Sequence, residues 1–499
     1  MFEKVALLEL SNSSLRMSIY KAVEGEYFVP LGQYEERIGV DEHLDIDGEQ
    51  LIRTPKFREC QAIIERFKQI AEAQGVVRYM SVASQAITRA KNYHSFVSEL
   101  GRTVGMAFRV MEDDEEVSAL YSATTSTLDV PKGIVVNISS TSTRILNYNR
   151  RIVLDSVVLP FGTSSAPSDI AADLEKSAPF LKTLDADSVM VGIGGTFTSL
   201  GRLARKLTKY PIEIEHNYVA DANAFEQVLK FLSGLDPEKR QKLRGISDSS
   251  ANSILTGLTI VKAILDYSGV NKVVVSQGYR NIGLMYQMIM PSTVDRPIPD
   301  LLTHSLETII GNAGIDGAVG TRLYDLSLVL FKQLKALHRL PRTYARILKV
   351  VSYLDGLSHV VGAGNHGRTN YALLLNLPLC GLSHREQIMA AFVASSRKWE
   401  DFQLGDWVKF QSIMQPNDLE AVKKLSNILA LATAMNIRNN GIVKDITCDI
   451  LGESVIIKLV ADPDGKAKLD HNICALEVYC AQKLGQEFTR AFGKNLDVL

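Results

Sequence analysis

The sequence predicts an α/β protein whose N-terminal half is duplicated into two lobes. Residues 5–20 and 134–148 both read as a buried apolar strand, a turn rich in hydroxyl groups and a returning strand. Related residues stand at matching positions of the two segments, in the pairs Glu9 and Asn137, Ser11 and Ser139, Ser14 and Ser142, Arg16 and Arg144, and Tyr20 and Tyr148. Because each segment opens its own run of strands and helices, we expect two lobes with a cleft between them. The turns would face this cleft and offer N–H and hydroxyl groups to a phosphate.

The first lobe is predicted to span residues 1–125. After the hairpin it continues into a helix at 55–74, a strand at 77–83 and a helix at 117–123. Strands that alternate with helices in this way are typical of an α/β lobe.

The second lobe is predicted to span residues 126–298. It contains a strand that runs into a glycine turn at 188–196, and another strand at 272–278. Beyond a proline-rich linker, residues 299–437 are predicted to form a helical domain. Residues 438–499 are predicted to form a small α/β cap of two strands and a closing helix.

The composition is that of a soluble globular protein. The chain has 499 residues, 46% of them hydrophobic, and a net charge of −1. This predicts three or four domains and gives no bulk attraction to nucleic acid or to a membrane surface. No apolar run is long enough to span a bilayer, and the first residues lack the pattern of a signal peptide. The five cysteines are scattered and odd in number, which favours reduced thiols and a cytoplasmic location.

Two motifs point to phosphate chemistry, and each also has a purely structural interpretation. The turn Gly192-Ile-Gly-Gly-Thr196 could present N–H groups and a helix N-terminus to a phosphate, although glycines at such turns are also common for packing. The acidic run at 112–116 could supply a general base for water. The spacing favours the start of a helix, with Asp113 as N-cap and Glu116 at N3 of a capping box, while Glu115 points elsewhere.

The helical domain carries two further patterns. Residues 331–354 contain six basic and no acidic side chains, which fits either a wall for a polyanion or a solvated helix face. His359, His366 and His384 lie in the same stretch, but their spacing matches no compact set of metal ligands.

Taken in order, the motifs resemble those of the exopolyphosphatase / guanosine pentaphosphate phosphatase (Ppx/GppA) family. Glu9-Leu-Ser-Asn-Ser-Ser14 is similar to the family's D-I-G-S-N-S, and Glu112-Asp-Asp-Glu-Glu-Val117 stands where the family has S-G-x-E-E-A. The resemblance covers nearly the whole chain and includes Arg37-Ile-Gly39, Ala83-Ser-Gln-Ala-Ile-Thr-Arg-Ala-Lys-Asn92, Leu159-Pro-Phe-Gly162, the turn at 192–196, Ser276-Gln-Gly278, Gly381-Leu-Ser-His-Arg-Glu-Gln387 and Arg397-Lys398.

The family belongs to the actin-like, ribonuclease H-like superfamily of sugar kinases and heat-shock-chaperone ATPases. The resemblance therefore implies actin-like lobes, followed by a helical domain related to His-Asp (HD) metal phosphohydrolases. The His-Asp element at Leu354-Asp355 has lost its first histidine, so we expect no metal there.

The second turn departs from the family pattern. The family's D-I-G-G-G-S-T-E reads Asn137-Ile-Ser-Ser-Thr-Ser-Thr-Arg144 here, so two acidic groups that the family associates with Mg²⁺ are lost. An arginine can bind phosphate but cannot hold Mg²⁺. The three glycines, which would let a phosphate approach the backbone closely, are replaced by Ser139, Ser140 and Thr141.

The resemblance assigns roles to individual residues. It implies Glu115 as the base that activates water and Glu9 as a Mg²⁺ ligand. It also implies a phosphate site lined by Ser11, Asn12, Ser13, Ser139, Ser140, Thr141, Arg144, Gly194 and Gly195.

The implied activity is that of an exopolyphosphatase-type phosphohydrolase. Such an enzyme removes the terminal phosphate from inorganic polyphosphate, or the 5′-γ-phosphate from guanosine pentaphosphate, by Mg²⁺-assisted attack of water, and we expect a homodimer. The alternative is a catalytically impaired family member that binds polyphosphate or a nucleotide as a sensor or regulator, which Asn137 and Arg144 favour. An actin-like kinase using ATP is a third interpretation, for which no acceptor-sugar motif is visible.

Overall fold

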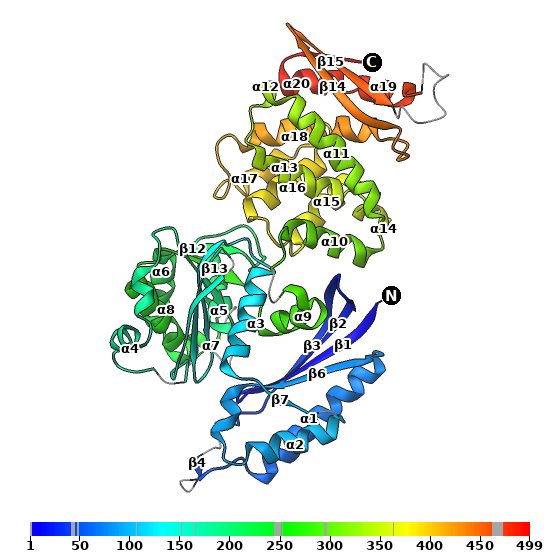
Figure 1. Cartoon of the computed structure of the whole chain (residues 1–499). Coiled ribbons are helices and arrows are strands. Elements are labelled where there is room, and N and C mark those ends of the chain that lie inside the picture. The colour runs from blue at the N-terminus through cyan, green and yellow to red at the C-terminus, as the bar shows by residue number, and fades with distance from the viewer. Residues whose placement is uncertain are drawn as a thin grey trace. The chain divides into compact units, whose positions relative to one another are not determined.

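The chain folds into two compact units (Figure 1). The computed structural model describes residues 2–40, 45–46, 49–105, 107–150, 152–164, 166–243, 251, 253–293, 297–362, 364–461 and 473–499. The first unit consists of Met1–Tyr210 and Ile214–Leu301, and the second of Pro211–Glu213 and Leu302–Leu499.

A five-stranded sheet forms the first lobe of the first unit. Its strand order is β3-β2-β1-β6-β7, with bounds Tyr27–Arg37, Ser14–Val23, Glu3–Leu10, Arg78–Ala83 and Arg109–Val110. Strand β1 alternates its buried side chains between the two faces. Ala6, Leu8 and Leu10 pack in the core that includes helix α1 (Thr54–Ala73), whereas Val5 and Leu7 pack in the core that includes helix α9 (Arg280–Ile289). The sheet is therefore covered on both faces, by α1 and α2 (Tyr93–Val104) on one and by α9 on the other (Figure 1).

The second lobe repeats this arrangement, which confirms the predicted duplication. Its six-stranded sheet has the order β10-β9-β8-β11-β13-β12, with bounds Ile152–Leu159, Thr143–Asn149, Lys132–Ile138, Val189–Ile193, Lys272–Ser276 and Tyr218–Asp221. In both lobes the first strand pairs antiparallel with the second and parallel with the strand that follows the crossover. Glu9 pairs with Arg16 in β1–β2, and Asn137 pairs with Arg144 in β8–β9, so the register matches the sequence repeat.

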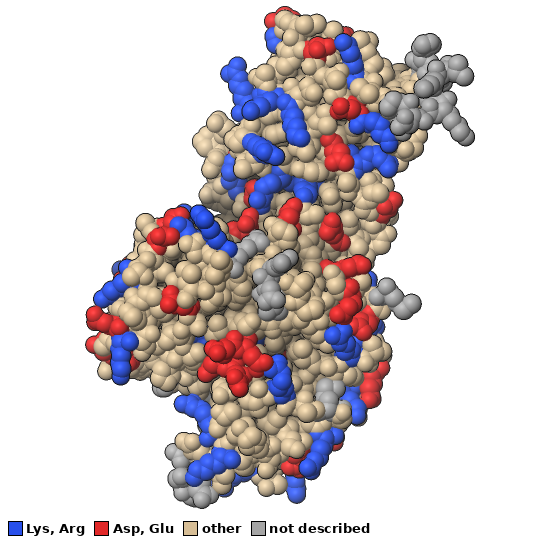
Figure 2. Space-filling view, viewed as in Figure 1, with Lys and Arg blue, Asp and Glu red and all other residues tan. Residues whose placement is uncertain are grey.

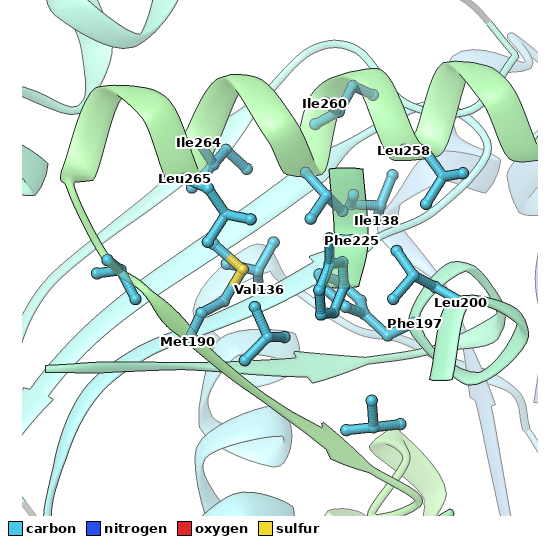
Figure 3. Packing of buried hydrophobic residues seen from close by; sticks show 14 of the residues in the cluster. Val136, Ile138, Met190, Phe197, Leu200, Phe225, Leu258, Ile260, Ile264 and Leu265 are labelled. Atoms are coloured by element: carbon cyan, nitrogen blue, oxygen red, sulfur yellow. The ribbon is translucent and has the colours of Figure 1, made fainter. Parts of the chain in front are cut away.

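The core of the second lobe lies between this sheet and helices α5 (Gly195–Leu207), α6 (Ala222–Ser233) and α8 (Ile254–Ser268). Figure 3 shows Phe197 and Leu200 of α5 beside Phe225 of α6 and the strand residue Ile138. Phe197 is fully buried, and burying such a side chain contributes about 1.5–3 kcal/mol. A Cβ on Gly192 would lie 2.0 Å from the Phe197 ring, so this glycine is required for packing.

Helices α3 (Asp113–Thr125) and α9 pack against each other at the centre of the first unit (Figure 1). A Cβ on Gly283 would lie 1.8 Å from the Ala119 carbonyl oxygen, so the two backbones touch at this glycine. The buried Asn281 donates to the Tyr20 hydroxyl at 2.9 Å and so ties α9 to β2. Together these contacts fix the starts of α3 and α9 relative to the sheet of the first lobe.

The second unit is a helical domain followed by a small α/β cap. Its longer helices are α10 (Leu301–Ala313), α11 (Gly317–Gln333), α13 (Ala345–Tyr353), α15 (His366–Asn376), α16 (His384–Ser395) and α18 (Asp418–Met435). The cap contains β14 (Val443–Leu451), β15 (Ser454–Ala461) and β16 (Asn495–Val498), with α19 (Ala475–Gln482) and α20 (Gly485–Phe492). Within its described residues the cap has one strand and one helix more than the sequence predicts, and the added strand β16 pairs parallel with β15. Among the described residues, no helix combines the length and the apolar character needed to cross a membrane.

Candidate functional site

The first unit contains a cleft of about 550 Å³ where the two lobes meet. It is walled by the β1–β2 turn, the β8–β9 turn, the β11–α5 turn and the first residues of α3 and α9. Ten of the eleven residues expected from the sequence line it, namely Glu9, Ser11, Asn12, Ser13, Ser139, Ser140, Thr141, Arg144, Gly194 and Gly195. Glu115 is the eleventh, and it lies outside this lining.

The two serine turns have the same hydrogen bonds. In the first, the Ser14 N–H donates to Ser11 Oγ at 3.0 Å and the Ser11 N–H donates to the Ser14 carbonyl at 2.9 Å. In the second, the Ser142 N–H donates to Ser139 Oγ at 3.0 Å and the Ser139 N–H donates to the Ser142 carbonyl at 2.9 Å. The Ser11 and Ser139 hydroxyls therefore hold the turns closed, a role that the sequence analysis did not give them.

The glycine turn opens helix α5 toward the cleft. Gly194 has a φ of +103°, a conformation that favours glycine. A Cβ on Gly195 would have no described atom within 4 Å, so the helix N-terminus is open to a ligand. Asn137 donates from Nδ2 to the Ile193 carbonyl at 3.1 Å and thereby ties this turn to the end of β8.

The acidic run begins helix α3 one residue earlier than predicted. The N-cap is Glu112, not Asp113, and the N3 residue of the capping box is Glu115, not Glu116. The Glu112 N–H donates to Glu115 Oε2 at 3.0 Å, and Arg109 pairs with the other carboxylate oxygen. Because one residue turns a helix by about 100°, this shift exchanges the orientations expected for the two glutamates. Figure 2 shows acidic side chains gathered at this end of α3.

Glu115 is thus an exposed capping residue in this structure. Its side chain is 43% exposed. Burial raises the pKa of Glu115, but the Glu112 N–H and the charge and hydrogen bond of Arg109 outweigh it, so the net shift is downward. A lowered pKa makes a carboxylate a weaker base, and its position argues against the role that the resemblance implies.

Glu116 takes the place in the cleft that was expected for Glu115. Its side chain is only 3% exposed. Its Oε1 accepts from Arg280 Nη1 at 3.1 Å, and its Oε2 accepts from Arg144 Nη2 at 2.7 Å. The Gln85 N–H donates to Oε1 at 3.3 Å, so the carboxylate is fixed from three sides.

Arg280 is a cleft residue that the sequence analysis missed. It is the first residue of α9 and donates from Nε and Nη2 to Glu9 Oε1, at 3.1 Å each. Burial would lower the pKa of Arg280, but the charges and hydrogen bonds of Glu9 and Glu116 raise it instead. The available signal was a basic residue just after a glycine at the carboxyl end of a strand, where ligands bind in α/β folds.

The residues of the cleft do not fit a Mg²⁺ ion well. Three of the four carboxylate oxygens of Glu9 and Glu116 accept from an arginine. Glu9 Oε2 is the remaining one, and it is buried without a hydrogen-bond partner among the described residues. A hard divalent cation prefers carboxylate oxygens, and here three of the four are already bonded to guanidinium groups.

The second unit contains a separate cavity of about 710 Å³. His359 and His366 line it with their rings 4.0 Å apart, and Asp355 in its wall pairs with Arg397. In the described parts of the chain, no three His, Cys, Asp or Glu side chains are placed to share a metal ion. His384 is buried at the start of α16.

Four of the six basic residues in the segment 331–354 are exposed, namely Lys332, Lys335, Arg339 and Arg342. Figure 2 shows lysine and arginine side chains gathered over the region of α12 (Lys335–His338), α13 and α18. Arg346 pairs with Glu386, and Lys349 bonds to Thr303, so these two side chains have partners inside the unit. Whether the others form a wall for a polyanion stays a prediction.

Known proteins resemble this chain in sequence. Exopolyphosphatase 1 of Mycobacterium tuberculosis is 20% identical over 280 residues, which are 52% of this chain and 80% of that protein. Exopolyphosphatase 1 of Mycobacterium leprae is 21% identical over 282 residues, which are 52% of this chain and 82% of that protein.

Solved structures show the same two-lobed fold. A Ppx/GppA family member of Aquifex aeolicus matches with a TM-score of 0.51 and 21% identity, over 58% of this chain and 99% of its own. An exopolyphosphatase from Cytophaga hutchinsonii matches with a TM-score of 0.52 and 14% identity, over the same shares. The predicted fold class is thereby confirmed.

The family model gives the same result. The model described as the Ppx/GppA phosphatase family matches residues 18–291, which are more than half of the chain. The match begins within β2 and includes the second serine turn, the acidic run and α9. On this evidence the chain belongs to the Ppx/GppA phosphatase family.

Proposed function

We propose that this chain is a phosphoanhydride hydrolase of the exopolyphosphatase type. It would remove the terminal phosphate from inorganic polyphosphate, or the 5′-γ-phosphate from guanosine pentaphosphate, by attack of water. The observation that carries the proposal is the buried carboxylate of Glu116 in a cleft that also presents two serine turns and a helix N-terminus. Family membership supports a phosphatase, and the geometry favours Glu116 over Glu115 as the base.

In this proposal different residues of the cleft bind the phosphate, stabilise its charge and accept the proton. Backbone N–H groups near Ser13, Ser140 and Gly195 orient the terminal phosphate, since turns and helix N-termini bind anions. Arg144 and Arg280 stabilise the negative charge that spreads over the phosphoryl oxygens in the transition state. A phosphate that draws these guanidinium groups away from Glu116 leaves its carboxylate free to accept a proton from the attacking water.

A second candidate function is a catalytically impaired protein that binds polyphosphate or a phosphorylated nucleotide and acts as a sensor or regulator. One observation favours it: both oxygens of Glu116 accept from arginines, at 3.1 and 2.7 Å. A carboxylate held in two ion pairs is a poor acceptor for a proton from water.

Phosphate release from long-chain polyphosphate distinguishes the two candidates. The native protein is compared with Glu116→Gln, which removes the base, and with Glu115→Gln as the matched neighbour. Release by the native protein that falls at least a hundredfold in Glu116→Gln and little in Glu115→Gln supports the hydrolase, given typical contributions of about 10²–10⁴-fold for a general base. Binding of polyphosphate without release leaves the sensor or regulator.

We further propose that the chain works in the cytoplasm as a homodimer, as the family resemblance implies. The absence of a membrane-crossing helix among the described residues is compatible with this location. Sedimentation equilibrium measures the oligomeric state, and a monomer at micromolar concentration would contradict the dimer.

A further inference from the structure

We propose that the cleft binds its phosphate without a divalent cation, because Arg280 and Arg144 supply the positive charge. This inference rests on the proposed function, which gives the cleft a phosphoanhydride ligand. The phosphoanhydride should therefore stay bound when a chelator removes divalent cations from the solution.

The Arg280 side chain is fixed in the cleft by hydrogen bonds to two carboxylates. All three of its guanidinium nitrogens are engaged, with Nε and Nη2 on Glu9 and Nη1 on Glu116, each at 3.1 Å. Its backbone is fixed because α9 and α3 touch at Gly283, one helical turn farther along. The close approach of the two helices therefore places Arg280 beside Glu116 before any ligand arrives.

Arg144 lines the same cleft and contacts the other oxygen of the Glu116 carboxylate. Its side chain is only 6% exposed, and it donates to Ser142 Oγ at 2.7 Å, Asp113 Oδ1 at 2.8 Å and Glu116 Oε2 at 2.7 Å. Its Nε is buried without a hydrogen-bond partner among the described residues. Because Nε is buried, a phosphate oxygen would bind this arginine by exchanging with an acceptor on Nη1 or Nη2, since guanidinium groups bind carboxylate and phosphate alike.

The charges that line the cleft are already balanced. The acidic side chains are those of Glu9, Glu35 and Glu116, and the basic ones those of Arg16, Arg144 and Arg280. Relative to the family pattern, Asn137 adds one unit of positive charge and Arg144 adds two. The protein has therefore gained at least the charge that one divalent cation would bring.

A divalent cation would have to displace guanidinium groups to reach these carboxylates. Each displaced arginine would remain partly buried beside a second positive charge, which is unfavourable at low dielectric constant. A phosphate, in contrast, can exchange with a carboxylate on the same guanidinium, because both anions accept bidentate hydrogen bonds. The arrangement thus favours an anion over a metal ion.

The test is the binding of inorganic tripolyphosphate to the full chain, measured by isothermal titration calorimetry in EDTA and in Mg²⁺. We expect the native protein to bind in EDTA. Arg280→Gln should bind about 10- to 100-fold more weakly in EDTA, the loss expected for hydrogen bonds to a charged group. Arg280→Lys, which keeps the charge but not the fork, should lie between the two. Arg78→Gln is the matched control, because Arg78 pairs with Glu3 and Glu24 outside the cleft. This variant should bind tripolyphosphate as tightly as the native protein does.

A reverse variant tests the same idea by restoring the family's carboxylates. Asn137→Asp combined with Arg144→Glu should lose binding in EDTA and recover it in Mg²⁺. Thermal unfolding of each variant identifies any loss of folding. If Arg280→Gln does not fold, the affinity of Arg280→Lys for tripolyphosphate in EDTA tests the inference instead. Native binding that requires Mg²⁺ would overturn the inference and leave the proposed function intact. No binding in either buffer would overturn both.

Discussion

Replacing Glu116 by glutamine should destabilise the first unit far more than replacing its neighbour Glu115. The two residues are adjacent in sequence and chemically identical, but the structure gives them opposite environments. Glu116 is 3% exposed and bonds to two arginines, whereas Glu115 is 43% exposed and pairs with Arg109, which is 52% exposed. The pair of variants therefore measures what burial does to one and the same side chain.

The expected costs follow from these environments. Removing one partner of a buried ion pair costs about 3–5 kcal/mol, and we expect about 3 kcal/mol because each arginine keeps a second carboxylate, Glu9 or Asp113. An exposed ion pair contributes about 0–1 kcal/mol, so Glu115→Gln should cost about 1 kcal/mol at most, including its capping hydrogen bond. The difference between the variants should be about 2 kcal/mol.

The two tryptophans make the assay specific. Both Trp399 and Trp407 belong to the second unit, so tryptophan fluorescence reports its unfolding and is blind to the first. Urea unfolding is followed by circular dichroism and by fluorescence together, since a chain of two units need not unfold in one step. Glu116→Gln should shift only the unfolding transition of the first unit, which circular dichroism follows and tryptophan fluorescence does not report. An equal shift for Glu115→Gln, or a shift of the fluorescence transition, would refute the placement of Glu116.

Three further outcomes follow from particular contacts. Gly283→Ala should cost at least about 1–3 kcal/mol in thermal unfolding, because its Cβ would lie 1.8 Å from the Ala119 carbonyl; unchanged stability would mean that α3 and α9 do not touch there. Ser11→Ala and Ser139→Ala should each cost about 1 kcal/mol, since both hydroxyls accept the same turn hydrogen bond, and unequal costs by urea unfolding would contradict the structural repeat. Burial lowers the pKa of His216 below its ordinary value. The stability that the neutral imidazole contributes should therefore be present above about pH 6.5 and be lost as the pH falls through the lower folded pKa, by up to about 1.4 kcal/mol per pH unit. The free energy of unfolding should decline less steeply between about pH 7 and 5 in a His216→Gln variant, and an equally steep decline would contradict this prediction.

The sequence predicts the hairpins well because their information is local. Strand alternation fixes which residues are buried, and a turn of fixed length fixes the register. Glu9 therefore pairs with Arg16, and Asn137 with Arg144, as the repeat indicates. Eight cleft residues lie on these turns and on the glycine turn, and Glu9 and Arg144 lie on the adjoining strands, so their proximity could be expected before the structure was known.

The acidic run shows where local rules fail. Aspartate is a better N-cap than glutamate, so propensity favours Asp113 over Glu112. The structure uses Glu112 because the Arg109 side chain and the Glu112 N–H hold Glu115 at N3. A shift of one residue is within the usual uncertainty of a helix boundary, yet here it decides which glutamate enters the cleft.

The position of Arg280 could not be predicted, because it depends on a contact between residues 271 positions apart in the chain. The spacing of β13 and α9 indicates that Arg280 begins a helix, but only the packing of α9 on α3 shows which carboxylates it meets. Long-range contacts of this kind are outside the reach of periodicity and motif spacing.

The loss of the family's carboxylates at positions 137 and 144 is better explained by replacement than by decay. An unpaired buried carboxylate costs several kcal/mol, so burial of one needs a partner of opposite charge. Glu116 has stayed buried, and the new Arg144 bonds to it at 2.7 Å. The two residues therefore depend on each other, and a double-mutant cycle of Glu116→Gln with Arg144→Gln should show a coupling of about 1–3 kcal/mol. A coupling free energy near zero would instead mean that Glu116 and Arg144 do not stabilise each other, and the cleft would then be the remnant of a metal site.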